Sequence, residues 1–118
     1  MERVIHFEIP SDNPEKAMTF YGNVFGWSFN QMGQNEYWLI KTGEEQSNGI
    51  NGGVMKKRDP NQPVVNTVKV NDISSTISKI EANAGTIVVP EFPIPGVGKQ
   101  AFFKDTDGHI FGIMQFEK

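Results

Sequence analysis

Two ionisable side chains near the start of the chain have the types and the spacing needed for acid–base chemistry. His6 and Glu8 are separated by one residue in a segment, 3–9, whose apolar and polar residues alternate. Such alternation predicts a β-strand with one apolar face, which places His6 and Glu8 together on the other face. An imidazole titrates near pH 6.5 and can serve as a general base that a carboxylate orients. Because residues two apart on a strand lie about 6.5 to 7 Å apart along the backbone, a structural, hydrogen-bonded histidine is the competing interpretation.

Composition excludes several other kinds of chemistry. The 118 residues include no cysteine, which excludes disulfides, thiolate metal ligands and a cysteine nucleophile. Of the two histidines, His6 and His109, neither is tied to a particular serine as in a hydrolase triad. A net charge of -3 and a pI near 5.3 argue against nucleic acid as a partner. The chain shows no signal-peptide core and no apolar run of about 18 to 20 residues, so we expect a cytoplasmic protein with no membrane contact.

The elements that must position these residues occur twice in the same order. The first series has a strand at 3–9, a helix from Pro14 to Gly26, and strands beginning near 27, 36 and 50. After a polar, proline-containing linker at about 58–63, the second series has a strand at 65–70 and a helix from 73 to Gly85. Strands at 86–89, 99–104 and 109–116 complete it. We predict an α+β fold in one domain, residues 1–118, with a βαβββ module at about 1–57 and another at about 64–118.

The proline- and glycine-rich segment 90–98 is predicted as a loop between two strands of the second module. Such a loop either covers a cleft as a lid or serves as a rigid surface connection.

The duplication allows positions in the two modules to be matched. Aligning 49–55 with 108–114 places Gly53 opposite Gly112 and Met55 opposite Met114. On the first strands, Thr67 takes the place of His6 and Lys69 takes the place of Glu8. The last match suggests an ion pair between Glu8 and Lys69, with two unrelated exposed charges as the alternative.

Four features together resemble the vicinal oxygen chelate superfamily, which includes glyoxalase I, the bleomycin and fosfomycin resistance proteins and the extradiol dioxygenases. They are the duplicated order, the first strand, the helix end Phe-Tyr-Gly-Asn-Val-Phe-Gly-Trp at 20–27, and Asp-Thr-Asp-Gly at 105–108 before the last strand. The resemblance implies a glyoxalase-like curved mixed sheet with helices on the outside and a cleft inside. It also implies a homodimer.

Metal-dependent members of that superfamily take their ligands from the first and last strands of each half. The matching positions here are His6, Gly53, Thr67 and Gly112, of which only His6 is a competent ligand. We therefore predict no metal and no other cofactor. Glycine at 53 and 112 either leaves space for a bound molecule or relieves crowding between strands.

Side chains on the predicted cleft face, with nearby aromatic residues, are the candidate contacts for a small-molecule ligand. They are His6, Trp38, Asn51, Met55, Thr67, Lys69, Phe102 and Met114. His6 and Glu8 are the candidate catalytic residues. The predicted function is metal-free binding of a small organic molecule. The alternatives are a lyase, isomerase or dioxygenase, or a drug-sequestering or noncatalytic binding protein.

Overall fold

The computed structural model describes residues 1–117 and divides the chain into two compact units. The first unit is His6–Val64, and the second consists of Met1–Ile5 and the chain from Val65 on. The opening strand is therefore shared, since Met1–Ile5 group with the second unit and the strand continues into the first. Each unit combines one helix with a mixed sheet, as the α+β prediction requires.

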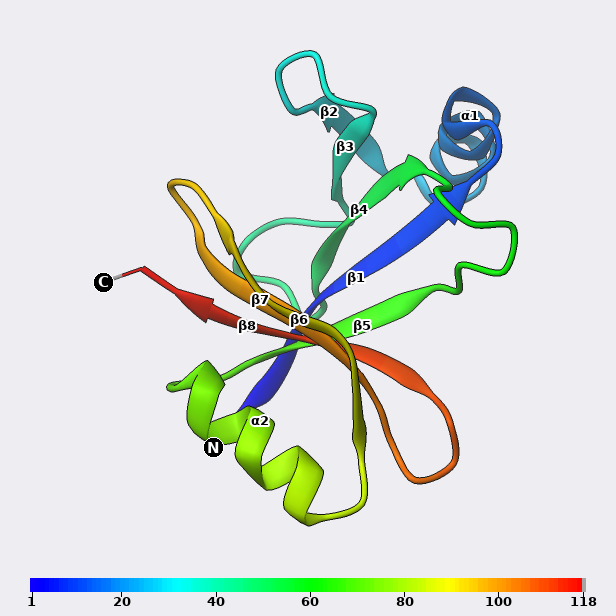
Figure 1. The fold of residues 1–118 in the computed structure, drawn as a ribbon. Coiled ribbons are helices and arrows are strands. Elements are labelled where there is room, and N and C mark those ends of the chain that lie inside the picture. Colours follow the sequence, from blue (N-terminus) through cyan, green and yellow to red (C-terminus); the bar gives the residue numbers. More distant parts are fainter. Residues whose placement is uncertain (118) are drawn as a thin grey trace. The chain divides into compact units, whose positions relative to one another are not determined.

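The first unit contains the elements that carry His6 and Glu8 (Figure 1). In chain order they are β1 (Arg3–Ser11), α1 (Pro14–Phe25), β2 (Ser28–Gln31), β3 (Tyr37–Lys41) and β4 (Asn51–Lys56). Within the sheet the order is β2-β3-β4-β1, with β1 parallel to β4 and the other neighbours antiparallel. The last strand of the module therefore lies between the first strand and β3, where side chains from both can meet over it.

Helix α1 begins and ends where its capping residues predict. The side chain of Asn13 accepts a hydrogen bond from the backbone N–H of Lys16, and Pro14 takes the first helical position. Gly26 ends the helix in the left-handed conformation, with φ 76°, which glycine adopts without the steric cost of a Cβ. The helix then turns directly into β2.

The second unit repeats this plan with a larger sheet. Its elements are β5 (Val65–Lys69), α2 (Ile73–Ala82), β6 (Thr86–Ile94), β7 (Gly98–Lys104) and β8 (Ile110–Phe116). The order is β5-β8-β7-β6, with β5 parallel to β8. Helix α2 packs on this sheet through a core whose buried members are Val70, Ile73, Ala101 and Ile113.

Strand β6 corrects the predicted loop at 90–98. The strand continues through Pro90 and Pro93 to Ile94 and pairs with β7, so only a short turn remains before Gly98. Proline lacks a backbone donor, but β6 is the edge strand and needs hydrogen bonds on one side only. Its pairing also shifts between Ile87 and Val89 and between Val89 and Phe92. The segment is an irregular strand of a hairpin, not a loop that folds over a cleft.

The strand registers also correct the matching of the two modules. On β4, Gly53 pairs with Glu8, whereas on β8 Gly112 pairs with Thr67. If the two glycines correspond, Thr67 therefore corresponds to Glu8, two residues along from His6. The match of Thr67 with His6 is therefore wrong by two residues. The sequence pattern alone could not reveal this, because every second residue of a strand lies on the same face.

Neither helix of residues 1–117 has the length and the hydropathy needed to cross a bilayer.

Candidate functional site

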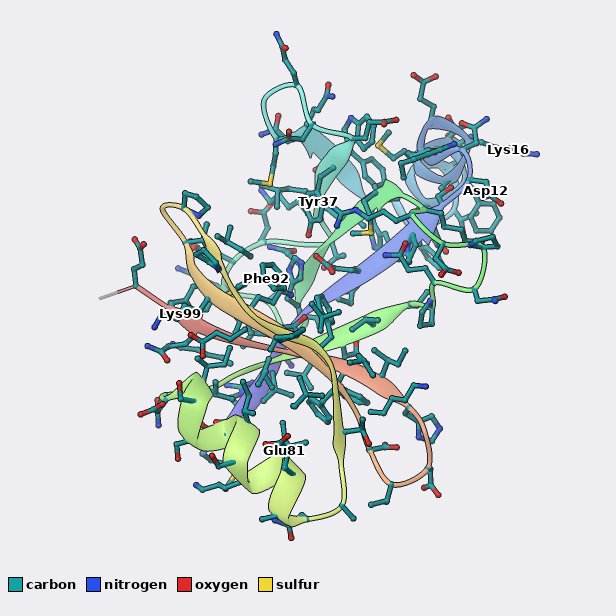
Figure 2. The ribbon with its side chains drawn as sticks, in the orientation of Figure 1. Asp12, Lys16, Tyr37, Glu81, Phe92 and Lys99 are labelled. Atoms are coloured by element: carbon teal, nitrogen blue, oxygen red, sulfur yellow. The ribbon has the colours of Figure 1, made fainter. Side chains whose placement is uncertain are left out.

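A chain of hydrogen bonds joins three polar side chains of the first unit. Tyr37 reaches from β3 toward β1, and its hydroxyl lies 2.9 Å from Nε2 of His6 and 2.8 Å from Oε2 of Glu8. Those two atoms of His6 and Glu8 are themselves 3.6 Å apart. Figure 2 labels Tyr37 on its strand. The predicted pairing of His6 with Glu8 on one strand face is thus present, with a tyrosine between them.

Gly53 provides the space that Tyr37 needs. It lies on β4 opposite Glu8, and a Cβ built at this position would overlap the hydroxyl and the ring of Tyr37. The glycine was expected either to leave space for a ligand or to relieve crowding between strands. The structure shows a different use of this glycine, because a side chain of the protein itself, Tyr37, fills the space.

Burial and hydrogen bonding act on the two acidic groups in different directions. Burial alone raises the pKa of Glu8, but the nearby His6, the hydrogen bond from Tyr37 and the charge of Arg58 outweigh it and leave the pKa lowered. Burial raises the pKa of the Tyr37 hydroxyl strongly, and the neighbouring Glu8 carboxylate raises it further. At neutral pH the site therefore holds an ionised Glu8 and a protonated Tyr37.

The protons available on His6, Tyr37 and Glu8 fix which group donates in each of their hydrogen bonds. The Tyr37 hydroxyl has one proton, which it donates to the Glu8 carboxylate, an acceptor only when ionised. His6 must then donate its Nε2–H to the Tyr37 oxygen. In the neutral imidazole this leaves the lone pair on Nδ1, so Nδ1 is the atom of His6 available to accept a proton or a hydrogen bond.

A pocket of about 400 Å³ lies beside these hydrogen-bonded side chains in the same unit. Its lining includes His6 and, directly opposite on β4, Asn51. Oδ1 of Asn51 accepts a hydrogen bond of 2.9 Å from the backbone N–H of Thr42, and its Nδ2 has no hydrogen-bond partner among residues 1–117. The remaining lining residues are Ser28, Phe29, Asn30, Leu39, Ile40, Lys41 and Gly52.

The other two predicted ligand contacts of this unit lie differently. Met55 is buried and pairs with Tyr37, so it shares the face of Gly53 and Glu8. Trp38 pairs with Val54 and so lies on the opposite face of the sheet from Tyr37 and His6. Neither residue lines the pocket, and their contact with a ligand stays a prediction.

The second unit brings the predicted residues Thr67, Phe102 and Met114 onto one face. Thr67 and Phe102 both pair with Gly112, and a Cβ there would lie 2.8 Å from the Thr67 hydroxyl and 3.2 Å from the Phe102 ring. Lys69 pairs with Met114 and holds its ammonium group 5.7 Å from the centre of the Phe116 ring. Within the described residues the buried hydroxyl of Thr67 has no hydrogen-bond partner.

Two residues of these clusters were missed by the sequence reasoning. Tyr37 and Gln100 occupy corresponding places, since Tyr37 pairs with Met55 and Gln100 pairs with Met114. Gln100 is buried, with its Nε2 3.4 Å from a Cβ built at Gly112. The available signal was alternation in the third strand of the module, which places Tyr37 and Leu39 on the face opposite Trp38.

Comparison with known proteins decides the family. The family model for the Glyoxalase/Bleomycin resistance protein/Dioxygenase superfamily matches residues 3–113. The chain belongs to this superfamily. The resemblance inferred from the first strand, the helix end and the final turn is thereby confirmed.

Related superfamily sequences carry glyoxylase names. The Mycobacterium tuberculosis protein named "Putative glyoxylase CFP32" is 32% identical over 114 residues, which is 92% of this chain but only 42% of that protein. The chain thus spans less than half the length of this relative. A "Glyoxylase-like domain-containing protein" of Didymella fabae is 28% identical over 112 residues, covering 90% of this chain and 88% of that one.

Solved structures of the superfamily share the fold. A superfamily member from Vibrio splendidus matches with a TM-score of 0.71 at 18% identity, covering 99% of this chain and all of that one, 100%. Methylmalonyl-CoA epimerase from Mycobacterium tuberculosis matches with a TM-score of 0.69 at 10% identity, covering 98% and 88% respectively. At these identities the likeness concerns the fold alone.

The residues at the superfamily's metal positions do not fit a divalent metal. Of the positions predicted from the sequence, His6, Gly53, Thr67 and Gly112, only His6 offers a strong ligand atom. The strand registers add Glu8 as the counterpart of Thr67, and the Tyr37 hydroxyl engages both Nε2 of His6 and Oε2 of Glu8. In a residue with a carboxylate at position 53, the Cβ would overlap the Tyr37 hydroxyl. Among residues 1–117, moreover, no three His, Cys, Asp or Glu side chains come together.

Proposed function

We propose that this superfamily member binds a small organic molecule in the pocket beside His6 and does so without a metal. The observation that carries the proposal is a pocket of about 400 Å³ bordered by a histidine that Tyr37 holds in one orientation. Pockets for small molecules are commonly about 300 to 1,000 Å³ and contain a few fixed polar groups. A histidine held by a hydrogen bond loses little side-chain entropy when a ligand binds.

The polar groups at the pocket define the kind of ligand. His6 offers an acceptor at Nδ1, and Asn51, its partner across the strands, offers a donor at Nδ2. Lys41, whose ammonium group lies 3.6 Å from the carboxylate of Glu44, adds a cationic group to the lining. We infer a ligand that carries a hydroxyl or N–H donor next to a carbonyl or carboxylate acceptor.

A ligand screen with matched variants tests this proposal. Compounds with adjacent donor and acceptor groups should raise the melting temperature, because a ligand at one hundred times its Kd stabilises by about 2.7 kcal/mol. His6→Ala should abolish the shift. His109→Ala should retain it, since the chain's other histidine is exposed on a turn of the second unit. Absence of any shift, or an equal shift in His6→Ala, would overturn the proposal.

A second candidate function is catalysis of proton transfer, as in a lyase or isomerase. The hydrogen-bonded chain from His6 through Tyr37 to Glu8 favours it, because such a chain orients Nδ1 of His6 as a base. A bound compound with an acidic C–H would then exchange that hydrogen with deuterated solvent. NMR of the recovered compound distinguishes this outcome from sequestration, in which the compound binds but its hydrogens do not exchange.

We also propose that two copies of the chain pair. The support is an apolar surface on α1, where Phe20, Val24 and Phe25 are more than half exposed. In addition, the mycobacterial relative is long enough to hold a second segment of this size. Light scattering should give twice the mass of 13.2 kDa, and Phe25→Glu should reduce it to the monomer. A wild-type monomer would contradict the proposal.

A further inference from the structure

The hydroxyl of Tyr37 lies where a cation held by His6 and Glu8 would have to lie. A ring nitrogen binds a metal along its in-plane lone-pair direction, the same direction that its N–H takes in a hydrogen bond. At Nε2 of His6 that direction leads to the Tyr37 oxygen, 2.9 Å away, and the same oxygen lies 2.8 Å from Oε2 of Glu8. Since Nε2 and Oε2 are only 3.6 Å apart, one small group can contact both, and the tyrosine hydroxyl is that group.

We propose that Tyr37 is a built-in occupant of a cation position and is the residue that keeps this site free of metal. His6 and Glu8 offer an imidazole and a carboxylate, two good ligand types, on one strand face. The phenol satisfies both, as it accepts from the imidazole and donates to the carboxylate. A cation could enter only by displacing a side chain that is hydrogen-bonded at both places.

Gly53 is the second residue on which the exclusion of a cation depends. Any side chain at position 53 would push Tyr37 out of its place, so glycine there is a condition for the tyrosine to reach His6 and Glu8. The pair therefore places a phenol from β3 in the space that a side chain at position 53 of β4 would need. This inference concerns a cation and not the organic ligand, so a failed ligand screen would leave it intact.

Cobalt titration of four proteins tests the proposal. Wild type should bind no Co²⁺ at this site. Tyr37→Phe removes the hydroxyl but keeps the ring over Gly53, so it should bind Co²⁺ more tightly than wild type and more weakly than Tyr37→Ala. Tyr37→Ala opens the place and should bind one Co²⁺ at least about tenfold more tightly than wild type, with the visible absorption of a bound ion. Adding His6→Ala to Tyr37→Ala should abolish that binding. Equal affinity in Tyr37→Ala and wild type would overturn the proposal.

A measurement on the wild-type protein keeps the test independent of how well the alanine variant folds. In a protein with ¹⁵N-labelled histidine rings, Nε2 of His6 should be protonated and stay so as Zn²⁺ is added. Displacement of that proton by stoichiometric Zn²⁺ would show that Tyr37 does not exclude the cation, and would overturn the proposal on its own.

Discussion

The surroundings of Gly53 and of Gly112 show two uses of the same backbone feature. Each glycine lies on the last strand of its module and is overlaid by side chains from both neighbouring strands. Around Gly53 those side chains form a continuous hydrogen-bonded chain. Around Gly112 they are Thr67, Gln100 and Phe102, and the Thr67 hydroxyl is buried without a partner among the described residues.

This difference teaches where to look for chemistry in a duplicated fold. In the first unit the space over the glycine is filled by a group whose protons are ordered by its neighbours. In the second unit the space over Gly112 is filled by closely packed side chains. Duplicated architecture therefore does not imply duplicated chemistry, and the comparison can be tested with equivalent substitutions in the two units.

The largest expected effect is that of adding a methyl group at each glycine. Gly53→Ala must displace the whole Tyr37 side chain and should lower the free energy of unfolding by about 3 kcal/mol. At Gly112 the closest atom is a threonine hydroxyl, which can rotate away, so Gly112→Ala should cost about 1 kcal/mol. Neither glycine has positive φ, so backbone strain does not enter. Urea unfolding measures both, and equal costs would remove the distinction between the two sites.

The next effect is removal of one hydroxyl from each cluster. Tyr37→Phe leaves His6 and the Glu8 carboxylate each without a partner and should cost about 2 kcal/mol. Thr67→Val removes a buried group that has no partner in the described chain, so stability should be unchanged or higher by up to about 1 kcal/mol. Chemical denaturation at pH 7 should therefore show a loss of stability in Tyr37→Phe, and no loss or a gain in Thr67→Val. A clear loss in Thr67→Val would reveal a hydrogen bond to that hydroxyl.

The smallest effect is the part of the pH dependence that arises from Glu8 in the first unit. Because the folded-state pKa of Glu8 is lowered, its contribution to stability is present above its ordinary value of 4.5 and disappears as the pH falls through the folded-state pKa. The stability difference between wild type and Glu8→Gln should therefore shrink on acidification. Unfolding curves between about pH 3 and pH 7 measure it. A difference that stays constant would mean that the Glu8 carboxylate is not held as described.

Much of the fold could be predicted because local signals and tertiary structure agree. Asn13 and Gly26 mark the ends of α1, and the alternation around His6 and Glu8 gives the face of β1. The extension of β6 through Pro90 could not be predicted. A proline-containing segment is tolerated in a strand only at a sheet edge, and edges are defined by the tertiary order of strands.

The candidate site was only half predictable for a similar reason. His6 and Glu8 come from one strand and are visible in its pattern, whereas Tyr37 reaches them across β4 from a strand 29 residues away from Glu8 in the chain. Its position depends on the register between β3 and β4, in which Leu39 pairs with Gly53. Trp38 was predicted as a contact instead of Tyr37. Because the two residues are adjacent in β3, their side chains lie on opposite faces of the sheet.

The prolines of β6 have a consequence for the behaviour of the protein at high concentration. An exposed edge strand can pair with a strand from another molecule and so begin aggregation. Pro90 and Pro93 have no backbone N–H to donate, and the two register shifts bend the strand, so another strand cannot pair with it as a regular ladder along its whole length. The irregularity that made this strand unpredictable from the sequence therefore protects this edge against open-ended β-assembly.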